Sequence, residues 1–235
     1  MTTDFTEALL SADRPVVMEI KPADGNGTDL LGGRPVAEVV AAYERAGAPC
    51  LSVVTGRWFG GDEQLLAEVA GRTRLPLLRK DFVTRTAHIS RSRELGASAV
   101  LLTARLLTRD SLRALAEECL RQGLTPFVEV SDAHQAAAVP FGTESVVAVA
   151  NKDITDRERG PADPPAGTAL LPAVRATGTR CPVSASGIAS PAQAAGLLRA
   201  GFAGLLIGTA LLRGGHPDDW LAELDRIRHE PAVRT

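Results

Sequence analysis

Short apolar runs alternate along the chain with longer stretches in which apolar residues recur at helical spacing. The short runs are bounded by polar, glycine or proline residues and lack the strict alternation of a half-exposed strand. Continuous apolar runs of this length are typical of parallel strands covered on both faces. The predicted strands are Val16–Ile20, Leu51–Val54, Leu77–Leu78, Ala99–Leu102, Pro126–Val130, Val146–Ala150, Val183–Ala185 and Gly204–Ile207.

The stretches between the predicted strands carry helix start and stop signals. Asp62, Asp110 and Ser190 stand where N-caps are expected, and Pro191 follows as a first-turn proline. Several stretches end in a glycine, as many helices do: Gly47, Gly71, Gly96, Gly123 and Gly201. The predicted helices are Val36–Ala46, Glu63–Gly71, Ala87–Glu94, Ser111–Gln122, Ala133–Val139, Ala169–Ala176, Pro191–Ala200 and Pro217–Ile227.

This alternation predicts one α/β domain over residues 1–235, folded as a single (βα)8 TIM barrel. An open doubly wound sheet is the alternative, but no glycine-rich dinucleotide fingerprint follows the first strand. Residues 1–14 would form a lead-in, and residues 155–168 a long polar loop after the sixth strand. In such a barrel the functional residues lie at the carboxyl ends of the strands.

Composition excludes several classes of protein. Hydrophobic residues make up 45% of the chain and charged residues 23%, which indicates a packed core rather than disorder. A net charge of −2 without clustered Lys and Arg argues against a nucleic-acid partner. No apolar stretch approaches the roughly 20 residues of a membrane span, and Met1–Arg14 lacks the pattern of a secretory signal. We therefore expect a soluble, cytoplasmic protein with no membrane partner.

Cysteine and histidine positions predict neither a disulfide framework nor a metal site. Cys50, Cys119 and Cys181 are odd in number and far apart, and we interpret them as small buried side chains. The four histidines make no metal-ligand spacing with one another or with the cysteines. We expect no metal.

Four charged residues stand in predicted strands or at their ends, where a barrel interior normally holds Val, Ile and Leu. Glu19 and Lys21 share one face at the end of the first strand, Lys80 follows the third strand, and Glu129 lies in the fifth. A buried ion-pair network is one interpretation, because an unpaired buried charge is costly. Their position at the top of the barrel favours an acid–base site, in which a desolvated lysine donates a proton and a carboxylate accepts one.

Glycine–hydroxyl pairs occur in the loops after the seventh and eighth strands. Ser186-Gly187 and Gly208-Thr209 would present backbone N–H groups, which is how this fold commonly binds a phosphate. A tight barrel turn explains one such pair equally well. Two pairs in the two expected loops favour phosphate binding by Gly187, Gly208 and Thr209.

The strand ends carry a series of short motifs: Glu19-Ile20-Lys21, Leu51-Ser52-Val53, Leu78-Arg79-Lys80-Asp81-Phe82, Val128-Glu129-Val130, Asn151-Lys152-Asp153 and Ser184-Ala185-Ser186-Gly187-Ile188. Their order and spacing resemble those of the indole-3-glycerol phosphate synthase family. The resemblance runs from about Val16 to Leu212, and the Leu-Arg-Lys-Asp-Phe stretch is its most specific part. The loop Trp58-Phe59-Gly60-Gly61 is similar to the family's aromatic-glycine loop after the second strand.

The resemblance implies a ring-closing reaction that needs no cofactor and no metal. The family's substrate is an anthranilate joined to a phosphorylated, ring-opened deoxyribulose. The ring carbon bearing the carboxylate condenses with a ketone, and CO2 and then water are lost. The resemblance implies Lys80 as general acid toward the ketone oxygen and Glu129 as its acid–base partner. Lys21 would assist proton transfer and substrate placement, and Glu19 would hold the lysines and the substrate hydroxyls. The implied substrate-binding positions are Asn151, Lys152, Ser186, Phe82 and Asp24.

The chain departs from the family's pattern around the substrate. Asp24 falls where a phosphate-contacting serine is expected, and an ionised carboxylate repels a phosphate. Ala150 and Lys152 stand in place of an asparagine and an arginine, and Ala185 in place of a glutamate. The family's helical segment before the first strand is mostly missing.

Because the acid–base set is intact, these departures favour a specialised paralogue in secondary metabolism, acting on a substrate with an altered ring or without the phosphate. An ordinary indole-3-glycerol phosphate synthase of tryptophan biosynthesis is the alternative.

Two other classes of function remain open. Lys80 or Lys21 could attack a carbonyl in a Schiff-base lyase. The chain could also be a non-catalytic barrel that serves as a partner-binding subunit. The expected partner is a small aromatic, amino-sugar-type substrate, and the oligomeric state is left open.

Overall fold

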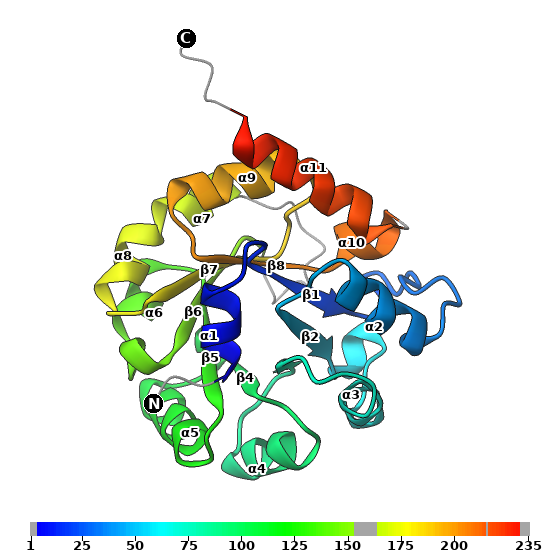
Figure 1. Cartoon of the computed structure of the whole chain (residues 1–235). Helices are drawn as coiled ribbons and strands as arrows, with labels where there is room; N and C mark the ends of the chain where they lie inside the picture. The colour runs from blue at the N-terminus through cyan, green and yellow to red at the C-terminus, as the bar shows by residue number, and fades with distance from the viewer. Residues whose placement is uncertain (1–3, 153–163, 215, 231–235) are drawn as a thin grey trace.

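Eight parallel strands close into a barrel in strand order in the computed structural model, which describes residues 4–152, 164–214 and 216–230 (Figure 1). The (βα)8 TIM barrel predicted from the sequence is confirmed. The strands are β1 (Val16–Ile20), β2 (Cys50–Val54), β3 (Leu77–Lys80), β4 (Ala99–Thr103), β5 (Thr125–Val130), β6 (Val146–Ala150), β7 (Cys181–Ala185) and β8 (Gly204–Ile207).

Helices surround the barrel as an outer ring (Figure 1). Helices α2 (Val36–Arg45), α3 (Glu63–Ala70), α4 (Thr86–Glu94), α5 (Arg109–Arg121), α6 (Ala133–Ala137), α8 (Leu171–Ala176), α9 (Pro191–Ala200) and α11 (Pro217–His229) match the predicted helices to within two residues at most ends. Three helices have no counterpart among the predictions: α1 (Asp4–Leu10), α7 (Pro164–Ala169) and α10 (Thr209–Arg213). Short 3-10 turns lie at η1 (Arg57–Phe59), η2 (Ala104–Leu106) and η3 (Gly142–Glu144). No helix in the described ranges is long and apolar enough to cross a membrane.

Strand side chains divide between two cores. Outward-facing residues such as Met18 and Ile20 pack beneath the helices, while inward-facing residues such as Val17 and Leu78 fill the barrel. This division explains the continuous apolar runs, because both faces of each strand are buried. The alternation also points Glu19 inward, between two outward-facing neighbours.

Helix α1 closes the amino end of the barrel, where it crosses the centre of the view in Figure 1. Phe5 and Leu9 are fully buried in the inner core, and the Phe5 ring meets Phe127 edge to face at 6.1 Å between centroids. A Cβ at Gly204 would come within 2.9 Å of Leu9, so the absence of a side chain there makes room for the helix. The lead-in of residues 1–14 therefore contains a short core-forming helix.

Two local predictions need correction. Asp110 does not cap its helix: α5 begins at Arg109, two residues before the predicted start, and the Thr108 hydroxyl accepts the hydrogen bond from the Ser111 N–H. The predicted loop ends at residue 168, whereas α7 already begins at Pro164. Proline suits a first helical turn, because its fixed φ is helical and its missing N–H is not needed there. The preceding part of that loop lies outside the described residues.

Candidate active site

The carboxylate of Glu19 lies between two lysine side chains at the carboxyl end of the barrel. Lys21 Nζ is 3.5 Å from Glu19 Oε1, and Lys80 Nζ is 3.2 Å from Glu19 Oε2. All three residues are at most 7% exposed. Strand alternation on β1 directs Glu19 and Lys21 to the same side, and Lys80 reaches them from the end of β3. A single buried carboxylate thus holds two ammonium groups that would otherwise repel each other.

The chain contains three lysines, and each ends or closely follows a strand of the barrel: Lys21 after β1, Lys80 at the end of β3 and Lys152 after β6. The rest of the 26 Lys and Arg residues are arginines. An ammonium group can give up a proton in a desolvated site, whereas a guanidinium in a protein stays charged. All the side-chain ammonium groups of the chain therefore lie at this end of the barrel.

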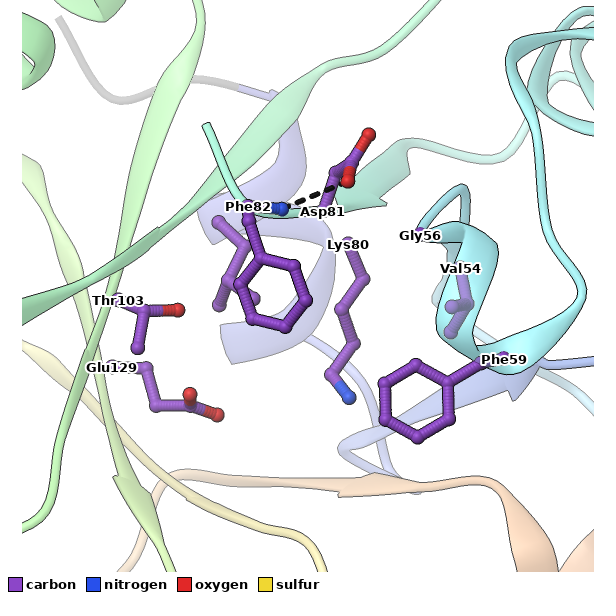
Figure 2. A pocket seen from close by; sticks show the side chains of 9 residues that line it. Val54, Gly56, Phe59, Lys80, Asp81, Phe82, Thr103 and Glu129 are labelled. Carbon is purple, nitrogen blue, oxygen red and sulfur yellow. Dashed lines mark hydrogen bonds between the residues drawn. The ribbon is translucent and has the colours of Figure 1, made fainter. Parts of the chain in front are cut away.

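A small aromatic pocket opens beside Lys80 (Figure 2). In Figure 2 the Lys80 side chain extends between the rings of Phe59 and Phe82, and the Glu129 carboxylate lies across the pocket from it. Glu129 is 6% exposed and is reached from β5. The lining residues are Val54, Gly56, Phe59, Lys80, Asp81, Phe82, Leu101, Thr103 and Glu129. Flat apolar walls with a lysine and a glutamate between them suit an aromatic ring whose reacting carbon faces both groups.

A second, larger pocket, open to solvent, lies over β7, β8 and β1. The predicted phosphate-binding residues Gly187, Gly208 and Thr209 line it together with Ser186 and Lys152. The remaining lining residues are Glu19, Lys21, Ile188, Ala189, Leu206, Ile207, Ala210, Arg213, Gly214 and Trp220. Two lysines, an arginine and glycine turns make this pocket suited to an anion.

Glu19 joins the two pockets. It lines the anion pocket, while its Oε2 is 3.2 Å from the Nζ of Lys80 in the aromatic pocket. A ligand with an aromatic ring at one end and an anionic group at the other would lay its middle across this ion pair. The four predicted catalytic residues are thus brought together at one end of the barrel, and the paired charges lie at the mouth of two pockets.

Asp24 does not line either pocket. Its Oδ1 accepts the backbone N–H groups of Asn26 and Thr28, and its Oδ2 accepts a 2.6 Å hydrogen bond from Arg213. Burial raises the pKa of Asp24, but the backbone N–H groups and the Arg213 guanidinium outweigh this, and the net shift is downward. Asp24 therefore ties the loop after β1 to α10, and its charge is offset by an arginine.

The segment after β6 is only partly in the pockets. Asn151 is buried, and its Nδ2 donates to Ser184 Oγ and to the Ser186 carbonyl, which braces the turn after β7. A Cβ on Gly167 would collide with Asn151 Oδ1, so α7 packs directly on this side chain. Lys152 is half-buried and lines the anion pocket, and Asp153 lies outside the described residues.

Arg79 points to the opposite face of β3 from Lys80 and anchors the strand end from outside. It is 5% exposed and bonds to Asp81 Oδ2 at 2.9 Å, to Thr55 Oγ1 at 3.2 Å and to Glu63 Oε1 at 3.2 Å. Asp81 also accepts the Thr55 hydroxyl and the Phe82 N–H, the latter drawn in Figure 2. Asp81 is therefore a structural carboxylate that shapes the turn carrying Lys80 and Phe82.

The cysteines take no part in this chemistry. Cys50, Cys119 and Cys181 are buried free thiols, as expected from the sequence. Burial raises the pKa of Cys119 and of Cys181 to about 12, so these thiols stay protonated and poorly nucleophilic at neutral pH.

Sequence reasoning missed Arg213 and Thr103, two residues that bring a charged or hydroxyl side chain to these pockets. Arg213 lies on the unpredicted helix α10 and lines the anion pocket. Thr103 ends β4 and lines the aromatic pocket. A period-two reading of the β4 run would place Thr103 on the inward face, which is the one signal for it in the sequence.

The fold and the two pockets define a class: a (βα)8-barrel enzyme whose charged residues meet at the carboxyl ends of its strands. A family model described as indole-3-glycerol phosphate synthase matches residues 1–224. The chain belongs to the indole-3-glycerol phosphate synthase family. It is accordingly a carbon–carbon lyase of the carboxy-lyase type.

Similar curated proteins bear the same name. An indole-3-glycerol phosphate synthase of Thermococcus kodakarensis is 33% identical over 97% of this chain and 99% of its own length. That of Pyrococcus furiosus is 35% identical over 88% of this chain and 90% of its own length. That of Nocardioides sp. is 34% identical over 88% of this chain and 78% of its own length.

Proposed function

We propose that this chain is an ordinary indole-3-glycerol phosphate synthase of tryptophan biosynthesis. Its substrate would be an anthranilate whose nitrogen carries a ring-opened deoxyribulose phosphate. The ring carbon that bears the carboxylate bonds to the ketone carbon, and the ketone oxygen takes up a proton to become a hydroxyl. CO2 then leaves and its bonding electrons restore the aromatic ring. Loss of the hydroxyl as water, together with a proton from the neighbouring carbon, completes the indole.

The observation that carries this proposal is the Glu19 carboxylate bridging Lys21 and Lys80 between an aromatic and an anionic pocket. The substrate has an aromatic ring at one end, a phosphate at the other and the reacting ketone between them. Lys80 would protonate the ketone oxygen, and Glu129 would exchange protons with the intermediate from the other side of the ring. Lys21 would assist proton transfer and orient the substrate, while Glu19 holds both lysines and the substrate hydroxyls.

The anion pocket supports a phosphorylated substrate. Backbone N–H groups at Gly187, Gly208 and Thr209 would bind the phosphate oxygens, with Lys21 and Arg213 supplying positive charge. Asp24, which argued against a phosphate, is paired with Arg213 and lies outside the pocket lining. Asn151, Lys152, Ser186 and Phe82 would complete the substrate contacts.

The similar proteins favour the ordinary synthase over the specialised paralogue suggested by the sequence departures. Lys152 keeps a positive charge in the anion pocket, so replacement of an arginine there retains part of its electrostatic role. Ala185 is fully buried on the inner face of β7, where it adds to the packed barrel core.

The test is an indole-formation assay with the phosphorylated substrate and with its dephosphorylated form. We expect turnover of the phosphorylated compound, and a loss of about 10²-fold or more in kcat for Lys80→Met and for Glu129→Gln. Arg121→Met is the matched control, because Arg121 lies on the exposed side of α5 and pairs with Glu118. Turnover of the dephosphorylated compound alone would contradict the proposal and favour the specialised paralogue.

Borohydride treatment during turnover separates this reaction from a Schiff-base lyase. With three lysines in the chain, a trapped adduct would map to one of three peptides. We expect none, because Lys80 acts as an acid rather than as a nucleophile. A stable adduct on Lys80 or Lys21 would favour the lyase, and an inactive wild-type enzyme would favour the non-catalytic barrel.

A further inference from the structure

The hydroxyl of Thr103 has no hydrogen-bond partner among the described residues. Thr103 is the last residue of β4, is 6% exposed and lines the aromatic pocket. Its Oγ1 is buried and lacks a partner of its own, and Figure 2 shows the hydroxyl pointing toward the side of the pocket that holds Phe82 and Lys80. A buried hydroxyl left unpaired is unfavourable, so in a pocket it is available to pair with a water molecule or with a ligand group that displaces that water.

Among the described residues that line the aromatic pocket, Thr103 is the one with an uncharged polar side chain. Val54, Phe59, Phe82 and Leu101 supply apolar walls, and the charged residues Lys80, Asp81 and Glu129 make up the rest of the lining beside Gly56. In the proposed reaction the substrate's carboxylate leaves as CO2 and its nitrogen carries the sugar chain, and the remaining edge of an unsubstituted ring offers a neighbouring hydroxyl no acceptor or donor of comparable strength. A ring with its own hydroxyl does, because a threonine hydroxyl both donates and accepts.

We propose that Thr103 is a specificity-determining residue that lets the enzyme accept substrates whose anthranilate ring carries a hydroxyl group. This inference rests on the proposed ring-closing function and names the class of ring that the same site takes. The Thr103 hydroxyl pairs with the ring hydroxyl, while Lys80 and Glu129 act on the reacting carbon and ketone unchanged.

A competing role for Thr103 is to position Glu129. The two residues lie opposite each other in the register of β4 and β5, so their inward-facing side chains are neighbours. The two roles predict different kinetics. A residue that recognises a ring substituent affects substituted and unsubstituted substrates differently, whereas a residue that positions Glu129 affects all substrates alike and changes the pH profile of kcat.

The test compares wild type with Thr103→Val, which removes the hydroxyl and keeps the shape. Substrates are prepared from anthranilate and from anthranilates hydroxylated at each free ring position, and kcat/KM is measured for each. For at least one hydroxylated substrate, we expect Thr103→Val to lose about tenfold in kcat/KM relative to the unsubstituted substrate, equivalent to about 1.4 kcal/mol. The readout is the ratio of kcat/KM for the hydroxylated substrate to kcat/KM for the unsubstituted one, so a general effect of the substitution on the pocket cancels.

Thr6→Val is the matched control. Thr6 is also 6% exposed with an unpartnered buried hydroxyl, but it lies on α1 at the opposite end of the barrel. This variant should leave the ratio of substituted to unsubstituted turnover unchanged.

The outcomes are distinguishable. An equal fall for every substrate in Thr103→Val, with an altered pH profile, would overturn the recognition role in favour of positioning Glu129. A wild-type enzyme that turns over the unsubstituted substrate but none of the hydroxylated ones would overturn this inference and leave the proposed function intact. A wild-type enzyme that turns over none of them would overturn both.

Discussion

The side chain of Glu19 lies directly against the backbone of Gly208. A Cβ at residue 208 would be 3.0 Å from both Cβ and Cδ of Glu19 and closer still to Oε1. The first residue after β8 therefore limits where the carboxylate that holds Lys21 and Lys80 can sit. A glycine predicted to bind phosphate also makes room for the acid–base cluster.

Gly208→Ala should displace Glu19 and separate the two lysines from their shared carboxylate. A shift of about 1 Å in a catalytic group can lower the rate by about 10²-fold, and we expect a loss of kcat of that order. Steady-state kinetics on the phosphorylated substrate measure it. Gly196→Ala on α9 is the control, because a Cβ there meets nothing within 4 Å and the variant should keep full activity. Wild-type kcat in Gly208→Ala would show that Glu19 is not held by this contact.

Arg213→Ala should weaken binding of the phosphorylated substrate. The guanidinium lines the anion pocket and is 56% exposed, so solvent screening reduces its contribution. We expect KM to rise by about three- to tenfold with little change in kcat. Arg226→Ala on α11 is matched in exposure, also 56%, and pairs with Glu223 away from both pockets. An unchanged KM in Arg213→Ala would show that Arg213 does not contribute to binding the phosphate.

The ion pair between Asp24 and Arg213 should make stability depend on acid pH. The folded-state pKa of Asp24 lies below its ordinary value of 3.8, so its stabilising contribution is complete above that value and is lost as the pH falls through the folded-state pKa. Wild type should therefore be more stable than Asp24→Asn at pH 7, with the difference shrinking below pH 3.8. Urea unfolding of both proteins over this range measures it. A difference that grows toward low pH would contradict the sign of this shift.

Arg79→Leu should destabilise the protein by about 2–4 kcal/mol, because it leaves Asp81 without its buried cationic partner. Glu63 keeps a second partner in Arg91 and is partly solvated, so its share of this cost is smaller. Chemical denaturation gives the free energy of unfolding. Arg72→Leu, which breaks an exposed pair with Glu68, should change it by less than about 1 kcal/mol. Equal effects from the two variants would argue against a structural role for the Arg79 cluster.

Phe5→Ala should lower the free energy of unfolding, because the Phe5 ring packs α1 into the inner core of the barrel. Phe5 is fully buried against Phe127, and loss of such a ring costs about 3–5 kcal/mol. Leu106→Ala, at a side chain 44% exposed, should cost little by comparison. Similar unfolding free energies for the two variants would mean that α1 contributes little to the stability of the closed barrel.

The sequence by itself determined the order of strands and helices and the set of charged groups at the strand ends. Local signals sufficed for this. Both faces of each strand are buried, so the strands appear as apolar runs, and Glu19, Lys80 and Glu129 stand out because they interrupt these runs on the inward face. Asp62 and Ser190 could be identified as helix caps from the sequence, because Asp and Ser favour that position. In the structure each side chain accepts a hydrogen bond from the backbone N–H three residues further on.

Only the tertiary structure decided which groups meet. The distance between Asp24 and Arg213 depends on closure of the barrel between β1 and β8, because 189 residues separate them along the chain. The burial of α1 depends in the same way on the open end that the closed barrel offers to Phe5 and Leu9. The unpaired hydroxyl of Thr103 could not be recognised from the sequence, since whether a polar group lacks a partner depends on every neighbour that folding brings to it.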